Sequence, residues 1–227
     1  MSSARNAGLD ATAGEYVDFV DSDDYIDENY YEVLIRNAAD NNADIANVST
    51  NFLNKKGKQA ILSPYHEFCL SKFSDKVDMF RGGNVWDKIF RRNLLARHGI
   101  RFSEGHNWEG NLFLLKAAFY SDKMSSSMDS FYHYTQNPDS ICRNPSAEME
   151  QKRIADRLFV CNDIANWLRS ERLSSRDFLS AMRLVERSVI DGGFYRKHKV
   201  AVWNALGFST VIRWRTGRKM KKFFRST

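Results

Sequence analysis

The chain has 227 residues, of which 43% are apolar and only three are prolines, so it can bury one core of good size, with or without a small appendage. No apolar run approaches the length of a membrane span, which argues against a membrane-spanning protein. Cys69, Cys142 and Cys161 show no CxxC spacing, so a disulfide framework and a zinc site are disfavoured and a reducing cytoplasm is indicated.

The net charge of +6 is concentrated at the C-terminal end of the chain. Seven basic and no acidic residues lie between Arg213 and Arg225, so the rest of the chain carries a net charge of −1. No recognised nucleic-acid module accompanies this basic tail. We therefore expect no nucleic-acid partner.

The first part of the chain alternates between helical and strand patterns. Residues 3–13 suit a helix that Gly14 ends, and residues 16–20 suit a short strand. Apolar positions then recur at helical spacing over 27–41, and residues 44–48 are strand-like. This alternation is typical of an α/β layer.

Three carboxylates, those of Asp21, Asp23 and Asp24, directly follow the strand predicted at 16–20. A strand that ends in clustered acids delivers them to an edge of the sheet, where they can hold a divalent cation and, through it, a diphosphate. The spacing alone also fits a solvated turn or the N-cap of the next helix.

The middle of the chain has a looser pattern. Residues 51–63 are polar and contain lysines, which fits a hairpin or loop on the acceptor side. Residues 108–120 place apolar side chains on one helical face, with Glu109 in the first turn, and residues 125–134 suit a strand and turn.

The pattern changes after Pro145. Residues 147–170 and 174–197 form two long amphipathic helical patterns, followed by 199–206 and the basic tail, with no strand signal. We therefore divide the chain into a first unit, 1–145, and a helical extension, 146–227.

Aromatic and cationic residues interleave between residues 211 and 225. Such a segment can lie on an anionic membrane surface, with its aromatic rings inserted and its cations at the headgroups. A solvated basic tail is the alternative.

Several segments appear in the order of a known signature. Residues 4–9 (ARNAGL), 13–16 (AGEY) and 19–24 (FVDSDD) resemble the ARNxGL, A.GEYI and FLDSDD segments of the family 2 glycosyltransferases. Residues 84–92 resemble the W.KLYRR segment of bacterial members that make surface polysaccharides. The match continues through three further segments, 100–105, 108–113 and 131–141. In total, the resemblance covers residues 2–143.

The resemblance implies a partial GT-A, Rossmann-like sheet sandwiched by helices, with a mainly helical C-terminal extension. In the family, the strands that hold the nucleobase precede the ARN segment, which here begins at Ala4. We therefore expect the chain to hold the later part of a GT-A domain and to have impaired activity.

The family chemistry is metal-dependent inverting transfer of a sugar from a nucleotide-sugar donor to a glycan or lipid-linked acceptor. By resemblance, Asp21, Asp23 and Asp24 are the candidate ligands of Mg²⁺ or Mn²⁺, with Asp23 the best candidate for direct ligation. Asp21 and Arg5 are the candidate nucleotide-binding residues beside Asp23. A lipid-linked acceptor would place the protein in the cytoplasm or peripherally at the inner face of the membrane.

Two tryptophans are candidates for stacking against an acceptor sugar. Trp108 lies beside the EDxxF-like segment, whereas for Trp86 core packing is an equal alternative. Lys88 could approach phosphate or lie on the surface, and His133 could add a metal ligand or be structural.

The main departure from the family pattern is at Gly110. Family members place an Asp after Glu109, and that Asp is the general base. Glycine cannot accept a proton, and loss of a positioned base typically costs ~10²–10⁴ in rate. Glu109 is the candidate catalytic substitute, although adjacent helix positions do not share a face. The alternative is a non-catalytic module that binds glycan, a membrane surface or a partner chain.

Overall fold

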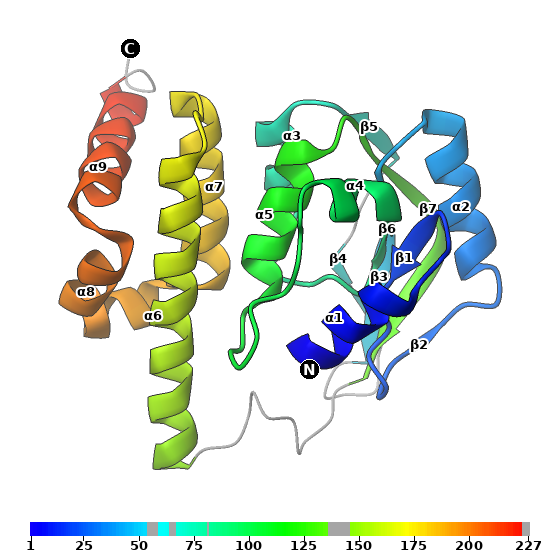
Figure 1. Ribbon diagram of the computed structural model, residues 1–227, viewed down its shortest axis with the longest axis horizontal. Helices are drawn as coiled ribbons and strands as arrows, with labels where there is room; N and C mark the ends of the chain where they lie inside the picture. The colour runs from blue at the N-terminus through cyan, green and yellow to red at the C-terminus, as the bar shows by residue number, and fades with distance from the viewer. Residues whose placement is uncertain (54–58, 64–66, 81, 136–145, 224–227) are drawn as a thin grey trace.

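The computed structural model describes residues 1–53, 59–63, 67–80, 82–135 and 146–223. A mixed sheet carries helices on both faces, and four further helices stand to one side of it (Figure 1). The strands are β1 (Tyr16–Asp18), β2 (Tyr25–Ile26), β3 (Ile45–Leu53), β4 (Gln59–Ser63), β5 (Phe68–Leu70), β6 (Lys88–Arg91) and β7 (Met124–Tyr134). The helices are α1 (Ser2–Ala11), α2 (Tyr30–Asn41), α3 (Phe73–Met79), α4 (Arg92–Arg97), α5 (Gly110–Tyr120), α6 (Ala147–Ser170), α7 (Ser175–Ser188), α8 (Gly192–Leu206) and α9 (Phe208–Phe223).

Strand β3 lies at the centre of the sheet, whose order is β1-β6-β3-β7-β2. It pairs in parallel with β7 and antiparallel with β6, so that Ile45 lies between Met124 and Phe90. Strand β4 pairs with β3, and β5 pairs with β7. Residues 45–48 of β3 are buried, because helices cover both faces of the sheet at this point.

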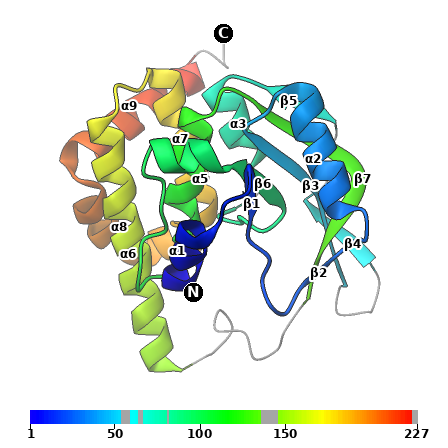
Figure 2. The same cartoon turned by 45° about the vertical axis from the view of Figure 1, so that its right-hand side comes forward.

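Helix α2 covers one face of the sheet with a small core (Figure 2). Tyr30, Val33 and Leu34 of this helix pack among residues from β3, β6 and β7. Tyr132 of β7 is fully buried in this cluster, and Trp86 stacks on its ring at 4.6 Å between centroids. The small core therefore fixes the strand that lies nearest the acidic turn.

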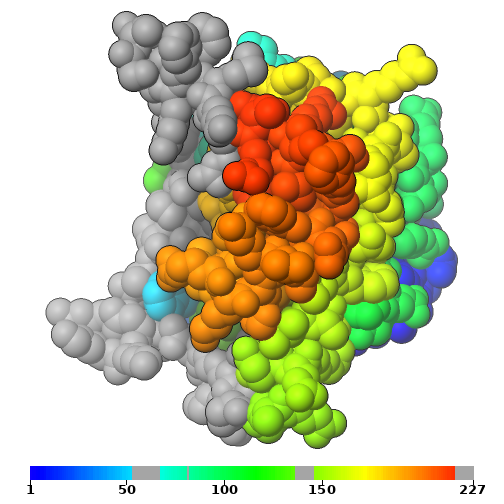
Figure 3. Space-filling model, turned by 90° about the vertical axis from the view of Figure 1, so that its left-hand side faces the viewer, coloured from blue at the N-terminus to red at the C-terminus, as the bar shows by residue number. Residues whose placement is uncertain are grey.

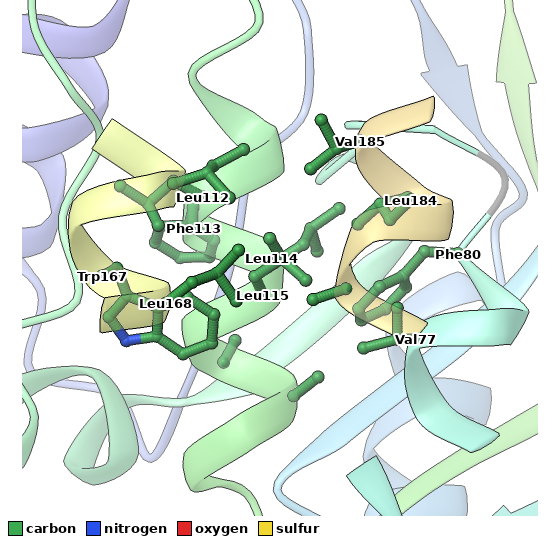
Figure 4. Packing of buried hydrophobic residues seen from close by; sticks show 14 of the residues in the cluster. Val77, Phe80, Leu112, Phe113, Leu114, Leu115, Trp167, Leu168, Leu184 and Val185 are labelled. Atoms are coloured by element: carbon green, nitrogen blue, oxygen red, sulfur yellow. The ribbon is translucent and has the colours of Figure 1, made fainter. Parts of the chain in front are cut away.

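The larger core lies on the other face, around α5. This helix is apolar on nearly all sides, and Leu112 through Leu115 are all buried. Figure 4 shows why: α5 lies between the Trp167–Leu168 turn of α6, the Leu184–Val185 turn of α7, and α3. A helix buried on several sides needs no polar face.

The helical extension begins where the amphipathic pattern predicts, but it contains one more break. Ser146 caps α6, and Ser174 caps α7 by accepting a hydrogen bond from the Asp177 N–H. The single helix expected over 174–197 is wrong, since Asp191 starts a new helix by accepting from the N–H groups of Gly193 and Phe194. Within the described part of the chain, we find no helix with the length and apolarity needed to cross a bilayer.

Three expectations fall partly outside the described residues. The loop expected over 51–63 includes residues 54–58, and the basic tail includes 224–227. The end of the family resemblance and the boundary expected at 145 lie within 136–145, which are also outside the described range.

Candidate functional site

The acidic residues follow β1, as expected, although the strand ends at Asp18 rather than at residue 20. Phe19 anchors the chain by packing edge-on against Phe102 and Phe113, with ring centroids 5.0 and 5.7 Å away. The next residues then turn back, with the Asp24 N–H donating to the Asp21 carbonyl at 3.1 Å. This turn holds the three candidate carboxylates at the end of the strand.

Arg5 joins two of the predicted site residues. Its Nη2 donates to Asp21 Oδ1 at 2.6 Å, and its Nη1 donates to Glu109 Oε1 at 2.9 Å. The guanidinium is only 13% exposed and lies over the Phe102 ring. The structure thus brings Arg5, Asp21 and Glu109 together, and Arg5 is not the plain surface cation that a helical position alone would suggest.

Burial controls the ionisation of Glu109. It raises the pKa of the carboxyl above its usual range, while the hydrogen bond from its own backbone N–H and the charge of Arg5 act in the opposite direction. Glu109 occupies the N-cap position of α5, yet its side chain makes no capping bond and turns to Arg5 instead. One of its carboxylate oxygens is therefore engaged by Arg5.

Tyr132 braces the other side of the acidic turn. Its hydroxyl donates to Asp24 Oδ2 at 2.7 Å and accepts from the Asp21 N–H at 3.2 Å. The N–H of Thr135 donates to the other oxygen of Asp24 at 2.8 Å, and burial raises the pKa of this carboxyl. Asp23, by contrast, is exposed and makes no ion pair with any described residue.

This arrangement fits a divalent cation that binds together with the phosphates of a substrate. In the described part of the chain, no three His, Cys, Asp or Glu side chains form a group able to hold a metal by themselves. Mg²⁺ is usually bound through one or two carboxylates together with substrate phosphates. Asp23, and Asp21 on its free oxygen, could supply those carboxylates.

The space beside Gly110 is filled by another segment of backbone. A Cβ atom built on Gly110 would lie 2.0 Å from the Gly83 carbonyl oxygen. The side chain of an Asp cannot enter here unless residues 82–84 move. The glycine at this position therefore goes together with a close contact to the Gly83 backbone, which the sequence does not indicate.

Helix α6 holds the loop that precedes α5. Asp156 is nearly fully buried and accepts two hydrogen bonds from Asn107, one from its N–H at 3.2 Å and one from its Nδ2 at 2.7 Å. It also accepts a hydrogen bond from Lys152 at 3.0 Å and lies 3.0 Å from Nδ1 of His106. Burial alone would raise the pKa of Asp156, but these bonds outweigh it and hold the pKa below its usual range. Sequence reasoning missed this residue, because nothing in a helical pattern marks an acid that binds a distant loop.

Trp108 is held by the same helix. Its backbone has a φ of 63°, unusual for a bulky residue, and the Arg157 guanidinium lies 4.6 Å from its ring centroid. Arg157 also pairs with Asp191 at 2.6 Å. One ring face is thus covered by Arg157, and Trp108 stays a candidate for acceptor stacking through the rest of its partly exposed ring.

Three other candidates are placed differently. Trp86 is 7% exposed and stacks on Tyr132, so the structure supports the core-packing alternative. Lys88 is buried in an ion pair with Asp87 and does not lie on the surface. His133 lies 2.7 Å from Asp27 rather than joining the acidic turn.

Comparisons with known proteins indicate the family to which the chain is related. Residues 1–106 match the model of glycosyl transferase family 2. The Bacillus subtilis protein EpsH, which carries a glycosyltransferase name, is 27% identical over 166 residues, 68% of this chain and 47% of EpsH. The cholesterol galactosyltransferase of Borreliella burgdorferi is 25% identical over 222 residues, 88% of this chain and 62% of that protein.

Among solved structures, Staphylococcus aureus TarS 1–349 in complex with UDP-GlcNAc matches with a TM-score of 0.70 and 21% identity. The match covers 94% of this chain and 61% of that one, and it confirms the expected GT-A fold. The chain is thus a relative of the family 2 glycosyltransferases. It spans about half the length of the first curated relatives it matches, 47% and 44%.

Proposed function

We propose that the chain is part of a glycosyltransferase that transfers a sugar from a nucleotide-sugar donor to a glycan or lipid-linked acceptor by metal-dependent inverting displacement. The observation that carries this proposal is the convergence of Arg5, Asp21 and Glu109 next to the exposed Asp23. TarS, the structural relative, was solved with a nucleotide sugar, which supports the same class of donor here.

The charge of the site supports a role for a divalent cation. One guanidinium, that of Arg5, faces the carboxylates of Asp21 and Glu109, and Asp23 adds a further negative charge. A diphosphate alone would meet net negative charge, whereas Mg²⁺ or Mn²⁺ would bridge the two. Residues Asp21, Asp23 and Asp24 are the proposed ligands or supports of that cation.

The acceptor is proposed from the relatives. Their names describe transfer to cholesterol and to poly(ribitol-phosphate), a lipid and a polymer. A lipid-linked or polymeric glycan acceptor fits both, and it would place the chain in the cytoplasm or peripherally at the inner face of a membrane. Trp108 is the proposed acceptor contact.

We propose further that turnover is impaired. No side chain extends from Gly110, the Gly83 carbonyl fills the space beside it, and Glu109 is engaged by Arg5. A non-catalytic module that keeps only the binding functions is the second candidate, and the same Gly83–Gly110 contact favours it.

Calorimetric titration of the purified chain with UDP, with and without Mn²⁺, tests the donor site. We expect binding that needs Mn²⁺ and that Asp23→Asn weakens by about tenfold, as loss of a charged ligand group would. Asp40→Asn makes the same change at an exposed position on α2 and should bind like the parent chain. An absence of binding in the presence of Mn²⁺ refutes a working donor site.

Release of UDP from UDP-GlcNAc tests the impairment. We expect turnover far below the roughly 1–10³ s⁻¹ of typical enzymes. A rate within that range would contradict the impairment and leave the transferase proposal intact.

A further inference from the structure

The outer face of α8 and α9 exposes large apolar side chains. Val200 is 71% exposed, Phe208 81% and Ile212 44%. Phe208 and Ile212 are one turn apart, so both point away from the buried side of α9. The two helices lie together on one face of the molecule, as Figure 3 shows, and this outer face of α8 and α9 is called the α8–α9 face below.

The charged side chains of α8 and α9 that the structure describes are all cationic. Residues 192–227 contain ten Lys or Arg residues and no Asp or Glu. Among the side chains that the structure describes here, the exposed cations are Arg196, Lys197, Lys199 and Arg215. Exposed apolar groups and cations thus share one surface without an opposing charge from either helix.

Trp203 joins the two helices into one surface. Lys199 Nζ lies 4.8 Å and Arg215 Cζ 5.1 Å from its ring centroid, so cations from α8 and α9 flank the same indole. A partly exposed Trp between cations is the combination that prefers the boundary between lipid headgroups and hydrocarbon.

We propose that the α8–α9 face binds the surface of an anionic lipid membrane. Phe208, Ile212 and Val200 would enter the acyl boundary, while the surrounding cations contact lipid phosphates. A nucleic acid would also attract the cations, but it offers no hydrocarbon in which to bury Val200 and Ile212. The inference rests on the proposed function only for its purpose, which is to bring the site to a lipid-linked acceptor.

Sedimentation of the full chain with vesicles, in the absence of donor and acceptor, tests the membrane contact. We expect binding to vesicles that contain phosphatidylglycerol, weak binding to phosphatidylcholine alone, and release by salt. The triple variant Val200→Ser, Phe208→Ser and Ile212→Ser should lose at least about tenfold in partitioning, because it removes the inserted apolar groups. Arg196→Gln with Lys197→Gln should lose about fivefold or more per charge.

Ile35→Ser is the matched control, since Ile35 is 51% exposed on α2, at the opposite side of the molecule (Figure 1). It should bind vesicles like the parent chain, and circular dichroism should show that all variants fold. The proposal is overturned if phosphatidylglycerol does not increase binding, or if the triple variant binds unchanged, as a loose basic tail would. The proposal is also overturned if a single-stranded oligonucleotide displaces the parent chain and the triple variant from the vesicles equally strongly. Because no nucleotide sugar is present, failure here is separate from failure of the donor site.

Discussion

Arg5 carries one positive charge between the carboxylates of Asp21 and Glu109, on segments that are 16 and 104 residues away along the chain. Each carboxylate could be recognised in the sequence as a site candidate by resemblance. Their contact with one guanidinium could not, because it depends on how α1 lies against the start of α5. The charge of Arg5 opposes the rise that burial causes in the pKa of Glu109.

Gly110→Asp is expected to destabilise the chain rather than restore a base. The new Cβ would lie 2.0 Å from the Gly83 carbonyl oxygen, and overpacking of this kind typically costs about 1–3 kcal/mol. The urea midpoint of unfolding measures the effect. Gly8→Asp is the control, because a Cβ at Gly8 meets nothing within 4 Å. Equal stability of the two variants would contradict this, because it would show that residues 82–84 move to admit the new side chain without loss of stability.

Asp18, at the end of β1, gives a pH-dependent prediction. Burial raises the pKa of its carboxyl from 3.8 to about 7, so the folded chain binds more protons than the unfolded chain between these values. Stability contributed by this group therefore falls as the pH rises from about 4 to about 7.

Asp18→Asn should remove this loss of stability, which a pKa raised from 3.8 to about 7 sets at about 4 kcal/mol. The variant should be more stable than the parent at pH 8 and similar at pH 4, as measured by urea unfolding at both pH values. Asp40→Asn, an exposed control, should show no such difference. A constant difference across this range would rule out titration of Asp18 as its cause.

At the scale of single elements, α6 is the helix that shapes the site from outside the sheet. Its Asp156 fixes the loop at residues 106–107, and its Arg157 covers Trp108. The amphipathic pattern predicts the helix itself well, with the expected limits of 147 and 170. Its contacts with the site were not predictable, because hydrophobic periodicity reports which face is buried and not which loop it meets.

Asp156→Asn is expected to loosen this loop and to lower stability by about 2 kcal/mol, since buried donors would lose their charged acceptor. The folded pKa of Asp156 is depressed, so its contribution is present above the unfolded pKa and disappears as the pH falls through the folded value. The difference from the parent should therefore shrink in acid. Denaturant unfolding at neutral and acid pH measures it.

Glu148→Gln, an exposed change on the first turn of α6, serves as the control for this experiment. An Asp156→Asn variant that is as stable as this control at neutral pH would show that the loop does not depend on α6.

Other elements show where sequence patterns are insufficient. The break at Asp191 arises from a local cap followed by Gly192 and Gly193. Trp86 and Lys88 lie in a motif that resembles a site segment, yet both are buried. Lys88 is buried because β6 pairs between β1 and β3, and Trp86 is buried because it packs in the small core beneath α2; both depend on residues far apart in the sequence.

For the whole molecule, the larger core joins the sheet to the helical extension. Phe113 and Leu115 of α5 belong to the same buried cluster as Trp167 and Val185. We therefore expect the fragment 1–145 to lack stable tertiary structure, because α5 and α3 would expose the surfaces that α6 and α7 cover. Dispersion of amide signals in a proton NMR spectrum, with the full chain as the control, measures this; a well-dispersed spectrum of the fragment would contradict it.

The placement of α5 also has a consequence for synthesis of the chain. Its apolar side chains pack against residues of α6 and α7, which are synthesised about 50 to 70 residues later. On a ribosome that adds roughly 5–20 residues per second, this apolar helix would remain incompletely covered for several seconds after it emerges. During that interval we expect α5 to be a segment of the nascent chain that a chaperone binds.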